Sequence, residues 1–343
     1  MEAKKEAKKE TIKELMSETK KEAIGEAIKE PKKEAIIIEN LIKKYDKKEA
    51  LKNINLTISE GEFYCLMGPN GSGKTTLSAI LASVREKTSG TVKIYGAPPD
   101  RARNLIGYMP QENFSSALLT GRENLIYFAG LLGNTGLQAK KIAEDLLGKV
   151  GLKEDADKLV SKYSGGMRKR LELATILFTG IKVLILDEPT TGLDPTARKN
   201  FFELVNDTRE NNITIFLITH IGTDAEMADR IGLIDEGRLI AEGTPDELKR
   251  NNNLKNALTI EANCKNERIK SILYGFSDGD QVVETDLGYK IYSDDIAEDI
   301  PEIIRKIDRE GFTVTRLEST TSTLDDVFYK LTGHSIKDRQ KIE

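Results

Sequence analysis

At 343 residues, the chain is long for one ordinary domain and suits a larger domain followed by a smaller one. Its 52 Lys and Arg face 56 Asp and Glu, and the net charge of -4 gives no overall signal for a nucleic-acid partner, although a local basic groove is compatible with it. No apolar run approaches the roughly 18 residues of a membrane helix, and the first residues lack the apolar core of a signal peptide. We therefore expect a soluble chain whose membrane role, if it has one, depends on another polypeptide.

The first 34 residues form a Lys/Glu/Ala tract. The string KKEAI occurs at residues 20–24 and again at 32–36. Glu and Lys four residues apart favour an exposed helix, but Gly25 and Pro31 interrupt it and little apolar surface is available for burial. We predict a charged, frayed or disordered leader over residues 1–34, with a partner-binding tail as the alternative. The two cysteines, Cys65 and Cys264, show neither metal-ligand spacing nor a disulfide framework, and we interpret both as small buried hydrophobes of a chain in a reducing cytosol.

The octapeptide GPNGSGKT at residues 68–75 follows an apolar run at 63–67 and precedes a helix-like segment from Thr76. This is the pattern G-x-x-x-x-G-K-[ST] in the order strand, loop, helix. Its glycines let backbone N–H groups surround a phosphate, and the helix N-terminus adds its positive dipole end. We name this stretch the phosphate loop; a chance Gly-rich turn is the alternative. Lys74 is expected at the β- and γ-phosphates and Thr75 at Mg²⁺, and the nucleotide-contacting residues would be Gly68, Pro69, Asn70, Gly71, Ser72, Gly73, Lys74, Thr75 and Thr76.

A second signal is the apolar run at residues 181–186, which ends in Asp187 and Glu188. A run of this kind suits a parallel strand buried on both faces, and ligands approach such sheets at the carboxyl ends of the strands. Adjacent carboxylates are rare there unless they are paired or bind a metal. We predict Asp187 as a Mg²⁺ ligand and Glu188 as the base for an attacking water, with a solvated strand end as the alternative.

The other predicted elements follow in chain order. Strands are expected at 36–41, 51–58, 90–96 and 105–111, the last ending at Gln111; helices fill about 121–162. A strand at 213–219 ends at His220, and a hairpin turns at Glu236 and Gly237. Strands at 258–262, 281–285, 289–292 and 313–317, with helices at 267–273 and 296–308, give an order that resembles a ferredoxin-like unit. An amphipathic helix at 324–331 closes the C-terminal domain, and a polar tail over 334–343 contains His334, to which we assign no role.

Five spaced motifs follow one another along the chain. Their order across about residues 36–248 resembles that of the ATPase subunit of an ATP-binding-cassette (ABC) transporter. The segment at residues 163–170, YSGGMRKR, is similar to the cassette signature that other phosphate-loop families lack. Ser164 is placed to cap the following helix, and Gly165 and Gly166 expose backbone N–H groups, which makes a second anion site. A plain helix start is the alternative.

The resemblance implies a role for each matching residue. Tyr45 would stack on adenine, Gln111 would contact Mg²⁺ and couple to a membrane partner, Asp194 would lie in a loop that crosses a dimer, and His220 would hold the γ-phosphate. The implied cofactors are ATP and Mg²⁺. Two cassettes of this family sandwich two ATP molecules, so the implied partners are a second copy and a separately encoded permease. The resulting site comprises catalytic Glu188, His220 and Lys74, metal-binding Thr75, Gln111 and Asp187, and the signature residues Ser164, Gly165 and Gly166 of the second copy.

The fold class implied is α/β: a P-loop NTPase core of the ABC type over residues 35–250, with an antiparallel β subdomain and a helical subdomain at about 112–170. A small α+β domain would follow at 258–333. The sequence departs from the family pattern in two places, the signature and the segment after His220. Tyr163 and Met167 stand where many cassettes have Leu and Gln, and the segment after His220 is about one residue shorter than usual.

The segments LTGRENL at 119–125 and LDDVFYKLTG at 324–333 are similar to drug-resistance-type exporters such as the daunorubicin-resistance ATPases. Exporters of lipids, antibiotics, sodium and polysaccharides share much of this pattern, so the cargo is left open. We hypothesise a peripheral ATPase on the cytoplasmic face of the membrane. The alternatives are a soluble cassette protein acting on nucleic acid or the ribosome, against which the single phosphate loop argues, and a nucleotide sensor, against which Glu188 and His220 argue.

Overall fold

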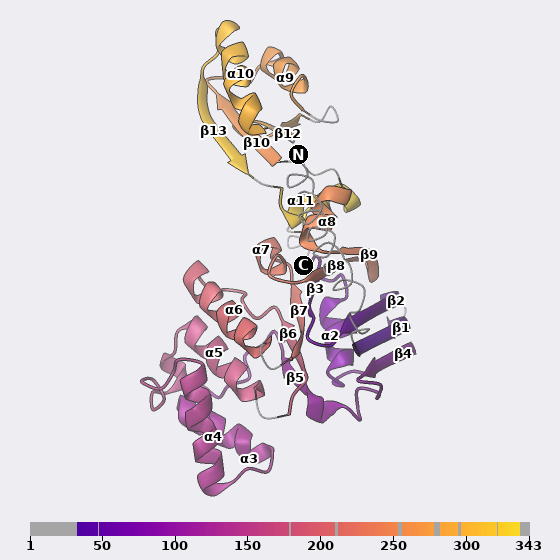
Figure 1. Ribbon diagram of the computed structural model, residues 1–343, viewed down its shortest axis with the longest axis vertical. Coiled ribbons are helices and arrows are strands. Elements are labelled where there is room, and N and C mark those ends of the chain that lie inside the picture. The colour runs from indigo at the N-terminus through magenta and orange to yellow at the C-terminus, as the bar shows by residue number, and fades with distance from the viewer. Residues whose placement is uncertain are drawn as a thin grey trace, which may run out of the picture.

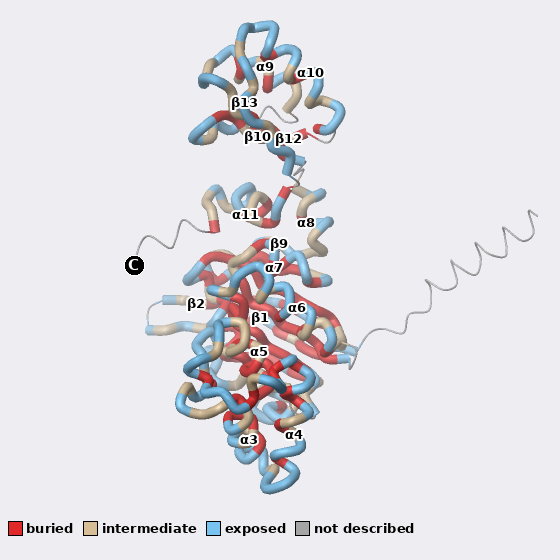
Figure 2. The backbone as a smooth tube through the Cα atoms, turned by 90° about the vertical axis from the view of Figure 1, so that its left-hand side faces the viewer, coloured by how far each residue is buried: buried red, intermediate tan, exposed pale blue. Residues whose placement is uncertain are grey.

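The computed structural model describes residues 33–46, 48–177, 180–209, 212–252, 256–277, 282–293, 296–320 and 322–336. The predicted leader therefore lies outside the described residues, except for Lys33 and for Glu34, which already begins a strand. The described part is elongated (Figures 1 and 2), with a helical bundle at one end, two sheets in the middle and a third sheet at the other end.

A six-stranded sheet with the order β5-β6-β7-β3-β8-β9 forms the centre of the molecule. Its first five strands run parallel, and β9 pairs antiparallel with β8 as the predicted hairpin. Every residue of β3, β6 and β7 is buried, which confirms the prediction of strands covered on both faces. Because parallel strands end at one edge, the phosphate loop, Gln111, Glu188 and His220 all follow strands at the same edge. The strands are β3 (Phe63–Met67), β5 (Ile106–Met109), β6 (Val183–Asp187), β7 (Thr214–Thr219), β8 (Arg230–Asp235) and β9 (Arg238–Gly243).

An antiparallel sheet of β2 (Lys48–Ser59), β1 (Glu34–Tyr45) and β4 (Ser89–Ile94) packs beside the central sheet. The shared core contains Ile36 from β1, Leu77 from helix α2 (Lys74–Leu81) and Ile185 from β6. Burial of these apolar side chains holds the phosphate-loop helix between the two sheets. Of the two cysteines, Cys65 is buried as predicted, but the prediction for Cys264 is wrong, because its side chain is exposed.

The helical bundle consists of α3 (Gly121–Leu131), α4 (Gly136–Lys149) and α5 (Gly165–Ile176) around an apolar core of its own. Thr120 starts α3 with a capping box to Glu123. The unusual Tyr163 has a structural reason here: its hydroxyl donates to the backbone oxygen of Asp155 at 2.8 Å. A Cβ atom on Gly121 would lie only 2.2 Å from that hydroxyl, so the tyrosine requires glycine at position 121.

The remaining elements of this larger part connect the sheets. They are two short 3-10 helices, Arg103–Leu105 and Val160–Lys162, and the helices α6 (Pro195–Arg209), α7 (Gly222–Ala225) and α8 (Pro245–Asn251). Helix α7, which follows His220, is a single turn.

The C-terminal sheet has the order β11-β12-β10-β13, with every neighbouring pair antiparallel. Helices α9 and α10 pack on it, and the order strand-helix-strand-strand-helix-strand confirms the predicted ferredoxin-like arrangement. The expected strand at 281–285 is only two residues long where it is described. The elements are β10 (Asn256–Ala262), α9 (Glu267–Tyr274), β11 (Val283–Glu284), β12 (Gly288–Ser293), α10 (Ile296–Arg309) and β13 (Val314–Thr320).

The last helix, α11 (Leu324–Thr332), differs from the prediction in its location. It lies between the two larger bodies (Figures 1 and 2), and its apolar face joins the core beside the central sheet rather than the core of the C-terminal sheet. The face is formed by Leu324, Val327 and Phe328, one helical turn apart, which cover α7 and α8. The expected polar tail also differs, since Ile336 is buried in the same core and His334 contacts Asp235 at 3.1 Å.

Candidate functional site

The phosphate loop lies between β3 and α2 and has the backbone that its glycines predict. Gly71 and Gly73 have φ angles of 77° and 106°, which favour glycine. A Cβ atom on Gly73 would lie 2.6 Å from the backbone oxygen of Ala50. The Nζ of Lys74 donates to the backbone oxygens of Gly68 at 2.8 Å and Pro69 at 2.9 Å, so the loop is closed around its own lysine.

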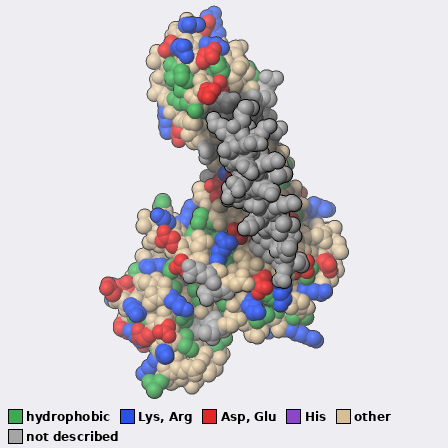
Figure 3. Space-filling model, viewed as in Figure 1, with side chains coloured by type: hydrophobic (Ala, Val, Ile, Leu, Met, Phe, Trp, Pro, Cys, Tyr) green, Lys and Arg blue, Asp and Glu red, His purple; other side chains and the backbone are tan. Residues whose placement is uncertain are grey.

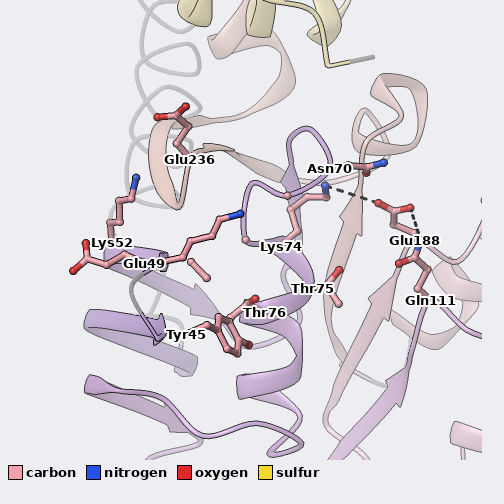
Figure 4. A pocket seen from close by; sticks show the side chains of 14 residues that line it. Tyr45, Glu49, Lys52, Asn70, Lys74, Thr75, Thr76, Gln111, Glu188 and Glu236 are labelled. Atoms are coloured by element: carbon pink, nitrogen blue, oxygen red, sulfur yellow. Dashed lines mark hydrogen bonds and ion pairs between the residues drawn. The ribbon is translucent and has the colours of Figure 1, made fainter. Parts of the chain in front are cut away.

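A cavity of about 920 Å³ opens beside this loop (Figure 4). The structure brings together there most of the residues predicted from the sequence, from β1, the phosphate loop and the ends of β5 and β6. The ring of Tyr45 lies at one side of the cavity, with the Nζ of Lys43 at 4.9 Å and the guanidinium of Arg85 at 5.2 Å from its centre. An aromatic ring next to two cations suits a ligand that is both planar and anionic. The predicted residues that line the cavity are Tyr45, Asn70, Gly71, Gly73, Lys74, Thr75, Thr76, Gln111 and Glu188.

The carboxyl group of Glu188 contacts three other predicted site residues. Its Oε1 lies 3.1 Å from the Nδ1 of His220 and 3.8 Å from the Nζ of Lys74, and its Oε2 accepts from the Nε2 of Gln111 at 3.4 Å. Burial raises the pKa of Glu188, but contacts with His220, Lys74 and Thr191 outweigh it, so the net pKa lies below the usual value. Its φ of 48° places a non-glycine residue in the left-handed region, which is often found where function fixes the backbone.

Asp187 faces the phosphate-loop helix. Its Oδ2 accepts from the hydroxyl of Ser78 at 2.7 Å, and its Oδ1 from the hydroxyl of Thr75 at 3.4 Å. Burial is the main reason why the pKa of Asp187 is raised, and the neighbouring Glu188 adds to it. A carboxylate and a hydroxyl side by side fit the oxygen ligands that Mg²⁺ takes, with water and phosphate to complete its shell. Ser78 was not predicted as a site residue, although it stands three residues after Thr75 on the same helical face.

The signature residues lie elsewhere in the chain. Ser164 accepts from the backbone N–H of Met167 at 3.2 Å, which confirms the predicted helix cap. Ser164 and Gly165 line a second cavity, of about 380 Å³, which shares only Gln111 and Glu188 with the first. No phosphate-loop residue lines the second cavity among the described parts of the chain. Within one copy, the two predicted anion sites therefore lie in two different cavities that adjoin at Gln111 and Glu188.

Comparison with known proteins agrees with this geometry. Residues 51–191 match the family described as "ABC transporter", and residues 243–332 match "ATP-binding protein DrrA1-3-like, C-terminal domain". The chain is 35% identical over 319 residues to the daunorubicin resistance ATP-binding protein DrrA2 of Streptomyces coeruleorubidus, an alignment that covers 90% of this chain and 98% of that protein. The chain belongs to the ATP-binding proteins of ABC transporters.

Two further similarities are to an export protein and to a solved structure. It is 35% identical over 309 residues to the Nod factor export ATP-binding protein I of Sinorhizobium fredii, covering 89% of this chain and 88% of that protein. A solved dimeric ATP-binding cassette, bound to ADP and Pi in a post-hydrolysis state, is 28% identical with a TM-score of 0.56 and covers 61% of this chain and 98% of its own. The chain is thus an ATPase of the ABC fold. Among its described residues, no helix is long and apolar enough to cross a membrane.

Two acidic residues of this ABC ATPase position neighbouring elements. Asp194 caps α6, because its Oδ1 accepts from the backbone N–H groups of Thr196 and Ala197, both at 3.0 Å. Asp224 on α7 is buried, accepts from the hydroxyl of Thr190 and lies 3.5 Å from the Nε of Arg198. It therefore ties the turn after His220 to the loop after Glu188. Asp224 was not predicted as a site residue. The one feature of the sequence that points to it is its position four residues after His220.

The raised pKa of Asp187 leads to a prediction about stability. A group that holds its proton more tightly when folded makes the protein less stable as the pH rises above the unfolded value, about 3.9 for Asp. We expect Asp187→Asn to raise the Tm of the ligand-free ABC ATPase by about 2 °C or more near neutral pH, and the gain to shrink towards about pH 4. Calorimetry in EDTA measures both values. The exposed Asp145→Asn is the control, and a gain independent of pH would contradict the prediction.

Proposed function

We propose that the chain is the ATP-hydrolysing subunit of an exporter, in which two copies close on two Mg-ATP and drive a separately encoded membrane permease. One observation carries this proposal: Glu188 lines the phosphate-loop cavity together with Lys74 and Gln111 and contacts both, and His220 contacts the same carboxyl group from outside the lining of the cavity. This arrangement suits attack of a water on a terminal phosphoryl group, because a γ-phosphate held by Lys74 would lie beside the Glu188 carboxylate, and His220 is in contact with that carboxylate.

The residues would divide the work as follows. The glycines of the phosphate loop and Lys74 bind the phosphates, and Tyr45 supports the adenine. Thr75, Asp187 and Gln111 hold Mg²⁺, which neutralises phosphate charge when bound. Glu188, ionised at neutral pH, orients the attacking water, and His220 fixes the γ-phosphate. Most of the rate would come from positioning and electrostatics.

The separation of the two cavities supports the assembly of two copies. The N–H groups after Ser164 do not line the phosphate-loop cavity of their own chain, although a helix N-terminus of this kind binds anions. A second copy related by a two-fold axis would place Ser164 to Gly166 opposite the phosphate loop, and Asp194 close to the junction. A single copy is then expected to hydrolyse ATP poorly.

The helical bundle offers the surface for a permease. Large apolar side chains are exposed on and beside α3 and at the start of α4. In the view of Figure 3, apolar side chains of the bundle stand among charged ones. We take the exposed apolar side chains of these neighbouring elements as the contact surface for the permease. With the relatives' names, this supports an exporter of drugs, lipids or similar apolar cargo and a place on the cytoplasmic face of the membrane. The exposed residues are Leu118, Tyr127, Leu131, Leu132 and Leu137.

We expect Leu137→Asp to uncouple the ATPase from its permease. Leu137 is 85% exposed in the first turn of α4, where an acidic residue is compatible with the helix dipole, so folding and basal turnover should not change. A charge buried in an apolar contact should lower permease-stimulated turnover about tenfold or more. The measurement is ATPase activity with and without liposomes that contain the integral membrane protein co-purifying with the chain.

Val84→Asp is the matched control, because Val84 is 68% exposed but lies outside the helical bundle. It should be stimulated like the wild type. If no multi-span membrane protein co-purifies, or if the chain is recovered with ribosomes instead, the exporter proposal is wrong. If Leu137→Asp is stimulated normally, α4 is not the docking surface.

A further inference from the structure

A buried carboxyl group in the helical bundle has no part in the function proposed above. Glu172 lies on α5, two turns after Ser164, and is fully buried. Its Oε1 accepts from the backbone N–H of Phe114 at 3.2 Å and from the N–H and hydroxyl of Ser115 at 3.4 and 2.9 Å. Its Oε2 lies 3.2 Å from the Nζ of Lys169. Burying a carboxyl group is costly unless it is paired, so this cluster calls for a reason.

The contacts of Glu172 join the loop after Gln111 to the signature helix. The same loop is also fixed to α3, since Ser116 and Asn124 exchange hydrogen bonds of 2.8 and 3.0 Å. The rings of Phe114 and Phe128 meet edge to face at 5.7 Å. Residues 114–116 are therefore tied to α5 and α3, while Phe114 also packs against the apolar core beside the central sheet.

The other end of this loop belongs to the sheet. Gln111 stands two residues after β5 and donates to Glu188 at 3.4 Å. Only Glu112 and Asn113 separate it from Phe114, and the three steps between the two Cα atoms span at most about 11 Å. A displacement of α5 relative to the sheet that exceeds the slack of these three steps would therefore pull on Gln111 as long as residues 114–116 stay attached to α5.

We propose that Glu172 is a positioning residue that fixes the loop after Gln111 to the signature helix, so that Ser164 and the Gln111–Glu188 contact move together. This rests on the roles of Ser164, Gln111 and Glu188 in the proposed function. Glu172 touches no phosphate-loop residue, and its effect on the reaction passes through the loop that it holds. Removing it should change turnover while leaving the binding of nucleotide to the phosphate loop intact.

The two carboxyl oxygens of Glu172 have different partners, so two substitutions at this position should differ in their effects. All three bonds to the loop go to Oε1, which a glutamine retains, whereas only the Lys169 contact goes to Oε2. We expect Glu172→Ala to lower kcat per folded chain by about 2- to 30-fold, with the KM for ATP and the Kd of a fluorescent ATP analogue unchanged within about twofold. Glu172→Gln should lose clearly less kcat than Glu172→Ala and stay near the wild-type value, although its Tm falls because its amide faces Lys169.

Leu146→Ala is the control for a merely structural role. Leu146 is buried in the same bundle on α4, so its truncation lowers the Tm. The proposal is overturned if Leu146→Ala loses as much kcat per folded chain as Glu172→Ala, if Glu172→Gln and Glu172→Ala lose kcat equally, or if Glu172→Ala keeps wild-type turnover. Failure of the proposed function would appear differently, as wild-type turnover in Glu188→Gln.

Discussion

Replacing Glu188 by Gln is expected to lower ATP turnover by about 10²- to 10⁴-fold while nucleotide binding is retained. The amide keeps the size of the side chain and its place beside Gln111 and His220, but it accepts no proton and no longer carries charge. The contacts of Glu188 keep its pKa below the usual value, so the carboxylate is ionised at neutral pH and the substitution removes a charged acceptor from the site. Single-turnover hydrolysis and binding of a fluorescent ATP analogue measure the two effects separately.

Two variants control this result. Glu203→Gln removes an acidic charge from the exposed face of α6 and should hydrolyse ATP like the wild type. Lys74→Ala should instead weaken nucleotide binding itself, because the Nζ of Lys74 is the cation at the phosphate loop. Wild-type turnover by Glu188→Gln would show that another group orients the water. Loss of binding in the same variant would place Glu188 in the nucleotide site for structural reasons.

Much of the site was predictable because its parts stand at strand ends. The phosphate loop, Asp187 and His220 each follow an apolar run, and parallel strands bring such ends to one edge of a sheet. The strand order itself and the meeting of four side chains at Glu188 were not derivable from spacing. They depend on which strands become neighbours; the resemblance to a known family gave the expected roles of the residues, and the structure gave the strand order.

The polar residues inside helices were not predictable for a different reason. Ser78 and Glu172 pair with residues 109 and 57 positions away in sequence, and Asp224 with one 34 positions away. In sequence, each looks like the solvated face of a helix, because its partner comes from another element. The location of α11 was not predictable for the same reason. Its amphipathic pattern was clear in the sequence, but its apolar face could have packed on either of two cores.

The second large effect expected is rescue between two inactive variants. Lys74→Ala disables the phosphate loop, and Ser164→Asp keeps the cap of α5 but puts a negative charge where the signature should meet a phosphate. Each variant alone should lose about 10²-fold or more of its turnover. A mixed pair has one site with both defects and one site with neither, because each site takes its two halves from different chains.

An equimolar mixture should therefore recover about a quarter of the wild-type rate, since half of randomly formed pairs are mixed and each has one intact site of two. Steady-state turnover of the mixture, after exchange of subunits without nucleotide, measures the recovery. Mixing Lys74→Ala with Glu188→Gln is the control and should recover nothing, because both defects then lie in the same half of the site and every site contains one of them. Absence of recovery with Ser164→Asp would mean that the signature serves the phosphate loop of its own chain, which requires the two cavities to merge by a movement of the helical bundle.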